Sequence, residues 1–339
     1  MKRICAILLA ALLGAFSAQI SAQGVKKPGK LAPKPLFRDP VHDGAADPTL
    51  IYNRSMHEWW MFYTNRRADL ATDVPKDVTW VHRTRIGIAV SKDKGATWTY
   101  RGEAQIPYGK DDYTHWAPDI VYWKGLYDMF LTIVPGTFKD WNAPREIIHL
   151  QSSDLENWKF ISKLDVGSER IIDPSLYQMD SGTWRIWYKD EADKSHIHYA
   201  DSPDLVNWTA RGTAVSDRGS EAPKVFRWSG RYWLITDAWH GLGVYYSDDL
   251  EHWTVQAQNL LATPGTMPTD RSIGHHCDVI VNGDRVFIYY FTHLVNEDAD
   301  PKIPHSSSHT VLQVAELELK DGQLYAARDA QTLVDLGPN

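Results

Sequence analysis

The stretch Ile172-Asp173-Pro174-Ser175-Leu176-Tyr177 decides the fold, because its central pattern recurs along the chain. The pattern is a proline, one further residue and an apolar pair that opens a short strand. It returns about every 50 to 70 residues, a spacing typical of four-stranded propeller blades. The five positions are Pro48, Pro118, Pro174, Pro223 and, with cysteine in place of proline, Cys277.

A second marker follows each of the first four copies. Two apolar strands separate it from the first marker, for example 184–188 and 197–200 in the third copy. The fifth copy lacks this second marker, which leaves its outer strand and the closure of the ring open. The marker is Ser-x-Asp followed within a few residues by a tryptophan, and it ends at Trp98, Trp158, Trp208 and Trp253.

These repeats predict an all-β protein, a five-bladed β-propeller with four-stranded antiparallel blades around a central channel. A β-sandwich is the simpler alternative, but it would not repeat the same markers in register along the chain. We expect the propeller to occupy residues 38–339 as a single domain.

The beginning of the chain has the features of a secretory signal peptide. Lys2 and Arg3 precede an apolar run over 4–16, and small residues follow up to Ala22. The run is too short to cross a bilayer, which needs about 20 residues. We expect residues 1–22 to be removed and residues 23–37 to form a leader segment that is mobile up to about Pro35. The mature protein would then be soluble and either secreted or periplasmic.

Composition narrows the class of protein further. The formal net charge is -7, which does not suggest a nucleic-acid or membrane surface. Of the two cysteines, Cys5 belongs to the signal peptide and Cys277 remains alone, so no intramolecular disulfide is expected in the mature chain. The 15 Trp and 16 Tyr residues suit a β-rich core, and a few of their flat rings are expected to stack on sugar rings.

Acidic residues gather at the proline positions, where the first strand of each blade should line the channel. A single Asp-Pro is typical of a turn that opens a strand. Several carboxylates around one axis repel one another, and that cost in stability is characteristic of an active site. These acids are Asp47, Asp119, Asp173, Glu221 and Asp278.

Four short motifs carry a family resemblance that spans nearly the whole chain after residue 22. They are Ala46-Asp47-Pro48, Trp116-Ala117-Pro118-Asp119, Ile172-Asp173-Pro174 and Ser220-Glu221-Ala222-Pro223. In this order they resemble glycoside hydrolase family 43 and its five-bladed relatives, which include families 62 and 117. The resemblance implies an inverting glycosidase in which Asp47 is the general base, Glu221 is the general acid, and Asp173 orients the acid and tunes its pKa.

These roles set an expectation for the protonation of the site. Glu221 has to carry a proton when the substrate binds, although an isolated Glu titrates near pH 4.3. We expect the charge of Asp173 to raise the pKa of Glu221. Asp47 should stay ionised so that it can deprotonate water.

The same resemblance implies a histidine of the fifth blade at the bottom of the site, near a metal ion in many relatives. His275 or His276 matches that position, although either alone could be a core histidine. We predict no required cofactor and no transition metal, and leave open a calcium ion near this pair. The predicted substrate-binding residues are Asp119, Trp116, His275, His276, Trp239 and Arg66. Weaker candidates are Arg67, Arg83, Arg170, Asp190, Glu191 and Asp237.

We therefore expect a secreted glycoside hydrolase that acts on an oligosaccharide or polysaccharide, without nucleic-acid or membrane partners. A glycoside phosphorylase is an alternative and would need a basic phosphate pocket. A sialidase-like hydrolase is another, because 91–98 is a complete Asp-box, but it would need six blades. A non-catalytic glycan-binding propeller is the third. The sequence leaves the sugar and the oligomeric state open, and the long insert at 65–85 is expected to shape the choice of sugar.

Overall fold

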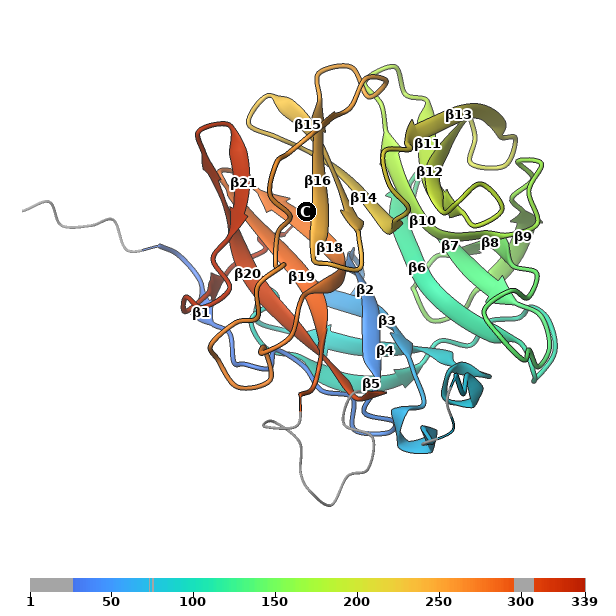
Figure 1. Ribbon diagram of the computed structural model, residues 1–339, viewed down its shortest axis with the longest axis horizontal. Coiled ribbons are helices and arrows are strands. Elements are labelled where there is room, and N and C mark those ends of the chain that lie inside the picture. Colours follow the sequence, from blue (N-terminus) through green and yellow to red (C-terminus); the bar gives the residue numbers. More distant parts are fainter. Residues whose placement is uncertain (1–26, 73, 75, 296–307, 339) are drawn as a thin grey trace, which may run out of the picture.

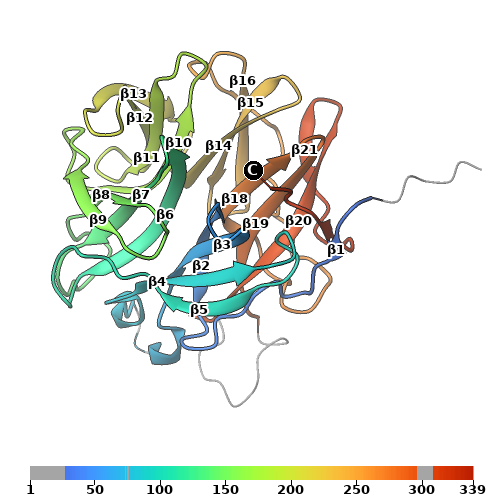
Figure 2. The same ribbon diagram turned by 180° about the vertical axis from the view of Figure 1, so that it is seen from behind.

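The computed structural model describes residues 27–72, 74, 76–295 and 308–338, so the predicted signal peptide lies outside the described residues. Within them the chain forms five four-stranded antiparallel sheets and one two-stranded sheet. The five larger sheets are arranged in a ring, with the first strand of each at the centre (Figure 1 and, from behind, Figure 2). The predicted five-bladed β-propeller is confirmed.

Each blade is built from consecutive strands, ordered from the centre outward. Blade 1 contains β2 (Ala45–Asn53), β3 (Glu58–Asn65), β4 (Arg85–Ser91) and β5 (Thr99–Glu103). Blade 2 contains β6 (Thr114–Trp123), β7 (Leu126–Val134), β8 (Glu146–Ser152) and β9 (Lys159–Lys163). Blade 3 contains β10 (Ile171–Gln178), β11 (Trp184–Asp190), β12 (His196–Ser202) and β13 (Thr209–Val215).

The last two blades follow the same plan. Blade 4 contains β14 (Glu221–Trp228), β15 (Arg231–Asp237), β16 (Leu242–Ser247) and β17 (Thr254–Val255). Blade 5 contains β18 (His275–Asn282), β19 (Arg285–His293), β20 (Thr310–Lys320) and β21 (Gln323–Ala326). Two short 3-10 helices, η1 (Ala68–Leu70) and η2 (Thr79–Val81), lie in the insert between β3 and β4. No helix in the described ranges is long and apolar enough to cross a membrane.

The core lies between neighbouring blades. The second strands are covered on both faces, so they read as continuous apolar runs rather than as alternating patterns. In β3, for example, every residue from Trp59 to Asn65 is buried. The outer strands β5, β9 and β13 are mostly exposed or half-buried, because only one face packs inward. Most of the abundant aromatic residues therefore serve the packing between blades.

The Ser-x-Asp marker forms the turn between the third and fourth strands, and its tryptophan packs into the interface with the preceding blade. In the third copy, Ser202 Oγ donates to the Asp204 carboxylate, which accepts the backbone N–H of Asn207 at 2.8 Å. The tryptophan that follows, Trp208, packs edge-on against Phe130 of blade 2 with ring centroids 5.5 Å apart. Trp98, Trp158 and Trp253 make the same kind of contact with an aromatic ring of the preceding blade. The Ser-x-Asp marker therefore contributes to the packing between neighbouring blades.

The two ends of the described chain close the ring. Strand β1 (Lys30–Leu31) pairs with β22 (Leu333–Val334), and Phe37 pairs with Leu312 of blade 5. Leu36 and Phe37 are buried in the core cluster shared by blades 1 and 5. The mobility predicted from residue 23 to about Pro35 does not fit residues 30–37 of the leader segment, because they pair with β22 and pack against blade 5.

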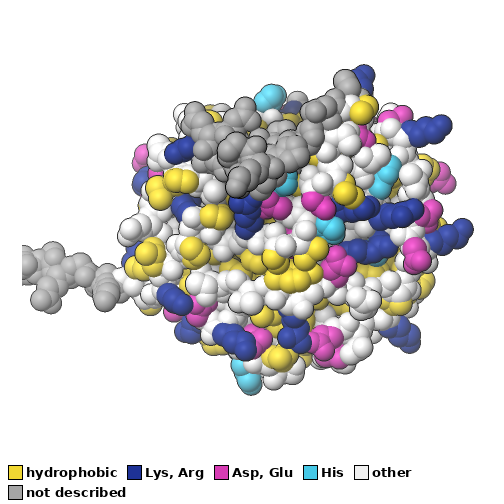
Figure 3. Space-filling model, turned by 90° about the horizontal axis from the view of Figure 1, so that it is seen from below, with side chains coloured by type: hydrophobic (Ala, Val, Ile, Leu, Met, Phe, Trp, Pro, Cys, Tyr) yellow, Lys and Arg dark blue, Asp and Glu magenta, His cyan; other side chains and the backbone are white. Residues whose placement is uncertain are grey.

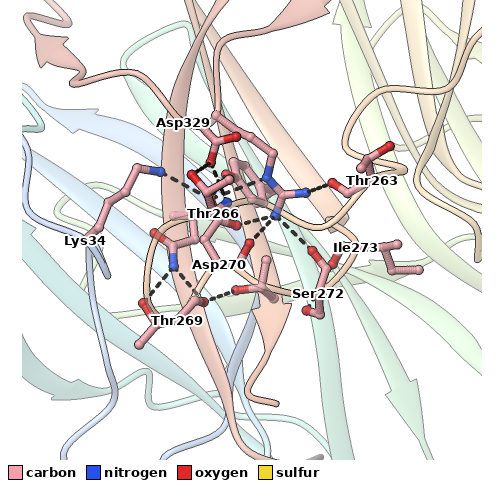
Figure 4. A network of polar contacts seen from close by, with 12 residues as sticks. Lys34, Thr263, Thr266, Thr269, Asp270, Ser272, Ile273 and Asp329 are labelled. Carbon is pink, nitrogen blue, oxygen red and sulfur yellow. Dashed lines mark hydrogen bonds and ion pairs between the residues drawn. The ribbon is translucent and has the colours of Figure 1, made fainter. Parts of the chain in front are cut away.

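A buried polar network supports the same closure (Figure 4). Asp270 lies at its centre and accepts Lys34 Nζ at 3.2 Å from the N-terminal segment and Tyr290 Oη at 2.9 Å from blade 5. Arg328, after the last blade, pairs with Asp270 and also donates to the Ser272 carbonyl at 2.9 Å. The network joins both ends of the chain to the segment that precedes β18.

The outer surface carries charges of both signs. In the view of Figure 3, Lys and Arg side chains are interspersed with Asp and Glu, and hydrophobic side chains form small groups. No block of one charge dominates that face, and strong attraction to a polyanion would require one.

Candidate active site

All five first strands contain an irregularity at the marker. In blades 1 to 4 the pairing with the second strand shifts at the proline and the residue before it, and in blade 5 it shifts just before Cys277. In four blades the residue before the proline has a left-handed φ: 49° at Asp47, 43° at Ala117, 56° at Asp173 and 52° at Ala222. Such bulges re-aim side chains and are common next to active sites. The repeated proline therefore marks the place where each inner strand bends.

The predicted catalytic acids Asp47, Asp173 and Glu221 come together in one pocket of about 390 Å³. They reach it from three different blades, on β2, β10 and β14. The predicted binding residues Trp116, Trp239, Arg66 and His276 also line this pocket. The structure thus places seven of the nine predicted site residues around a single cavity.

Asp47 lies between two basic side chains. Arg66 Nη2 is 3.4 Å from its Oδ1 atom, and His276 Nδ1 is also 3.4 Å from that atom. The Arg66 guanidinium lies over the Phe291 ring, 4.4 Å from the centroid. Arg66 and His276 therefore hold the same carboxylate oxygen of Asp47 from two sides.

Asp173 is buried, with 6% of its surface exposed. Its Oδ2 accepts the backbone N–H of Ala222 at 3.1 Å, and its own N–H donates to Thr132 Oγ1 at 3.0 Å. Burial raises its pKa to about 7; the charges of Glu221 and Asp47 act in the same direction and His276 opposes them. Asp173 is therefore the pocket acid that most readily holds a proton.

Glu221 is held by Lys189, whose Nζ lies 2.8 Å from Glu221 Oε2. Burial works against its ionisation, but the charge and hydrogen bond of Lys189, with Trp239 and His276, outweigh burial and lower its pKa. The expectation that Asp173 raises the pKa of Glu221 is wrong for this arrangement. Lys189 stabilises the negative charge of Glu221 and so lowers its pKa, and the acid with the raised pKa is Asp173.

Of the charged residues of the pocket, the sequence interpretation missed Lys189 and Arg145 and named Glu191 only as a weaker candidate. Lys189 lies on β11 and Glu191 directly after that strand, and Lys189 Nζ is 3.3 Å from Glu191 Oε1. Arg145, which is almost fully buried, donates to Glu191 at 2.7 Å. The stretch 188–191 was the only signal for Lys189 and Glu191, and no sequence pattern pointed to Arg145.

Aromatic side chains form much of the remaining wall. Trp80 of η2 lines the pocket, as does Trp141 from the loop between β7 and β8. Trp141 and Trp239 are 48% and 42% exposed, so their faces are accessible from outside. Trp80 brings the insert at 65–85 to the pocket wall, and the effect of this insert on the choice of sugar stays a prediction.

Two predicted binding residues lie elsewhere. Asp119 is buried outside the pocket lining, where it accepts the Leu176 N–H at 2.7 Å and pairs with Lys224 at 3.0 Å. His275 pairs with Asp237 at 3.0 Å and stacks on Phe291. Neither residue lines the pocket: His275 is one step from His276 along β18, and Asp119 follows its marker proline, whereas Asp47 and Asp173 precede theirs. Arg67, Arg83, Arg170 and Asp190 are also outside the lining.

The absence of a required transition metal stays a prediction, and a calcium ion near His275 or His276 stays open. Within the described ranges, no group of three or more His, Cys, Asp or Glu side chains is placed to hold a metal ion. Calcium takes six to eight oxygen ligands. Near His276 the closest carboxylate is that of Asp47, which already faces Arg66.

No protein-family model matches the chain, and no curated protein matches it in sequence. Many solved structures match in fold. One is a thermostable family-43 glycoside hydrolase, with 19% identity, a TM-score of 0.63, and coverage of 89% of this chain and 99% of that one. Another is a GH43 β-1,3-galactosidase bound to galactodeoxynojirimycin, with 14% identity, a TM-score of 0.64, and coverage of 87% and 98%.

A third neighbour is the GH43_1 enzyme from Xanthomonas citri in complex with xylotriose. It has 14% identity, a TM-score of 0.61, and coverage of 91% of this chain and 96% of that one. At identities this low, structural similarity establishes the fold only, and the activity has to be argued from the residues of the site. Over most of its length the chain is structurally similar to the five-bladed propeller glycoside hydrolases of family 43.

Proposed function

We propose that this protein is a glycoside hydrolase that cleaves an oligosaccharide or polysaccharide with inversion of configuration. The observation that carries the proposal is the convergence of Asp47, Asp173 and Glu221, from three blades, in one pocket with aromatic walls. In such enzymes a pair of aspartate or glutamate side chains on opposite sides of the sugar acts as general acid and general base.

The reaction needs two proton transfers. Asp47 takes a proton from water as the water oxygen bonds to the anomeric carbon. The bond from that carbon to the leaving oxygen breaks, and Glu221 gives its proton to that oxygen. Asp173, which holds the backbone N–H next to Glu221, positions the acid. Because Glu221 has a lowered pKa, it has to gain a proton before each turnover.

The aromatic walls support a sugar substrate. Trp141 and Trp239 present exposed rings at the pocket, and Trp116 lies deeper. Flat rings bind the apolar faces of sugars through large contact areas with little loss of conformational freedom. The structural neighbours bound to xylotriose and to galactodeoxynojirimycin place oligosaccharides and monosaccharide analogues among the ligands to test first.

A glycoside phosphorylase is the second candidate, because three cations line the pocket: Arg66, Arg145 and Lys189. Each of them faces a pocket carboxylate, which makes the site less suitable for phosphate. A sialidase-like enzyme fits less well. The structure has five blades, and its complete Asp-box lies in the turn between β4 and β5.

From residues 1–22 we infer in addition that the protein is secreted or periplasmic, where a polysaccharide substrate would be met. No cofactor enters the proposed reaction.

The test is a panel of aryl glycosides, oligosaccharides and polysaccharides with the Glu221→Gln and Asp47→Asn variants. Glu221→Gln should lose activity on natural glycosides by about 100-fold or more, and lose less on aryl glycosides whose leaving group needs no proton. Asp47→Asn should fail on both kinds, because water stays unactivated. Near-native hydrolysis by folded Glu221→Gln protein contradicts the assignment. Turnover that requires added phosphate favours the phosphorylase.

A further inference from the structure

One register position is used in the same way in several blades. It is the residue on the second strand that pairs with the residue two before the marker proline or cysteine. In blades 1, 2 and 4 its side chain accepts a backbone N–H of the next blade. Thr64 accepts from Ala117 at 2.8 Å, Thr132 from Asp173 at 3.0 Å, and Asp237 from His276 at 3.2 Å.

Blade 3 departs from this rule. Lys189 pairs with Ile172 and so occupies the same register position, but an ammonium group cannot accept a hydrogen bond. The corresponding N–H, that of Ala222, goes to Asp173 instead. Blade 5 has Phe291 at this position and also lacks an acceptor there. Lys189 therefore does not supply the hydrogen bond that connects one blade to the backbone of the next between blades 3 and 4.

The ammonium group of Lys189 is placed between two carboxylates. It lies 2.8 Å from Glu221 and 3.3 Å from Glu191, and Lys189 itself is 5% exposed. Glu191 has a second partner in Arg145, at 2.7 Å. Lys189 can therefore pair fully with either acid, and a shift toward Glu191 leaves Glu221 without its cation.

We propose that Lys189 is a positioning residue that decides when Glu221 carries the proton needed by the reaction. While Lys189 pairs with Glu221, the carboxylate stays ionised. When a bound sugar draws Glu221 away, or Lys189 turns to Glu191, Glu221 takes up a proton from solvent. This inference rests on the proposed function of Glu221 as the general acid.

Several charged groups surround Glu221, and among the residues that the structure describes Lys189 is the one that forms an ion pair with it. The lowered pKa of Glu221 agrees with this, because Lys189 provides the largest opposing contribution to the effect of burial. The surrounding groups on every neighbouring element are Lys189 and Glu191 of the β11 end, Asp173 of β10, Asp237 of β15, His275 and His276 of β18, Asp47 of β2, and Arg145 before β8.

The test compares Lys189→Met, which removes the charge, with Lys189→Arg, which keeps it. In Lys189→Met the basic limb of the kcat/KM profile on an unactivated oligosaccharide should move up by roughly 1 pH unit or more. In Lys189→Arg it should stay in place. On an aryl glycoside with a leaving group that needs no proton, the limb should not move. Lys163→Met, which removes a surface cation paired with Glu146, is the matched control and should leave the profile unchanged.

A second readout needs no substrate. The carboxyl carbon of Glu221, identified by its absence in Glu221→Gln, should titrate at higher pH in Lys189→Met by carbon-13 NMR. If Lys189→Met does not fold, Lys189→Gln takes its place. An unmoved limb together with an unmoved Glu221 titration overturns the role of Lys189 and leaves the hydrolase proposal intact. If no glycoside is cleaved, the hydrolase proposal fails, and the titration alone decides the role of Lys189.

Discussion

Two lysines of this propeller each lie between two carboxylates, and their surroundings differ. At the pocket, Lys189 lies 2.8 Å from Glu221 and 3.3 Å from Glu191. In the channel, Lys224 lies 2.7 Å from Asp278 and 3.0 Å from Asp119. The side chains of Asp119 and Asp278 are at most 5% exposed, whereas that of Glu221 is 29% exposed.

The channel carboxylates and the pocket carboxylates also differ in their hydrogen bonds to the backbone. Asp119 of blade 2 accepts the Leu176 N–H of blade 3, and Asp278 of blade 5 accepts the Leu50 N–H of blade 1, both at 2.7 Å. Lys224 adds blade 4, so the channel group ties all five blades. In the described part of the chain, Glu221 and Glu191 accept no backbone N–H. The two channel carboxylates therefore hold the backbone of neighbouring blades, whereas Glu221 and Glu191 are held only by side chains and are available for chemistry.

The largest effect expected from this comparison is on stability. Lys224→Met should lower the free energy of unfolding by about 3–5 kcal/mol, because two buried carboxylates lose their cation. Lys189→Met should lose less than half as much, because Glu221 faces the pocket and can protonate. Urea unfolding at pH 7 measures both. Equal losses in the two variants would remove the distinction between the channel and the pocket.

A smaller effect should come from Asp173. Its pKa of about 7 lies above the usual value of 3.8, so the folded protein keeps a proton that the unfolded chain has released. The contribution of Asp173 to the free energy of unfolding therefore falls as the pH rises from 4 to 7. Asp173→Asn should be more stable than the native protein by on the order of 2 kcal/mol at pH 8, and equally stable at pH 4.

Thermal unfolding at both pH values tests this, with Asp278→Asn as the channel control. Burial also raises the pKa of Asp278, but its carboxyl group binds Lys224 and the Leu50 N–H. Asp278→Asn should therefore lose stability at pH 8, where Asp173→Asn gains it. A gain for Asp173→Asn that does not change with pH would contradict the pKa argument.

The smallest expected effect concerns binding at the pocket rim. Trp239 is 42% exposed, and Lys189 Nζ lies 5.2 Å from the centroid of its ring. Trp239→Ala should weaken oligosaccharide binding by roughly 5- to 10-fold, which is about 1 kcal/mol. Tyr325→Ala removes a ring of similar exposure on β21, away from the pocket, and should leave binding unchanged. Calorimetry with the best oligosaccharide of the panel compares them; equal losses would show that Trp239 does not contact the sugar.

The ring of five blades could be predicted from the amino-acid sequence alone. The marker prolines and the Ser-x-Asp turns act within a few residues of chain, and their repetition is visible without any partner. The same local logic placed Asp47, Asp173 and Glu221 at the bends of three inner strands. Each side chain follows from the strand on which it lies, so its position could be predicted.

The pairing of charged side chains in the pocket and in the channel follows from the tertiary structure and could not be predicted from the sequence. Asp119 and Asp173 both lie beside a marker proline, yet one ties blades in the channel and the other lines the pocket. Lys189 and Arg145 meet at Glu191 from two different blades, and residues 30–37 close the ring against blade 5. Contacts of this kind join segments far apart in the chain. They depend on how the blades pack, and that packing also sets the burial and the neighbouring charges that raise the pKa of Asp173 and lower the pKa of Glu221.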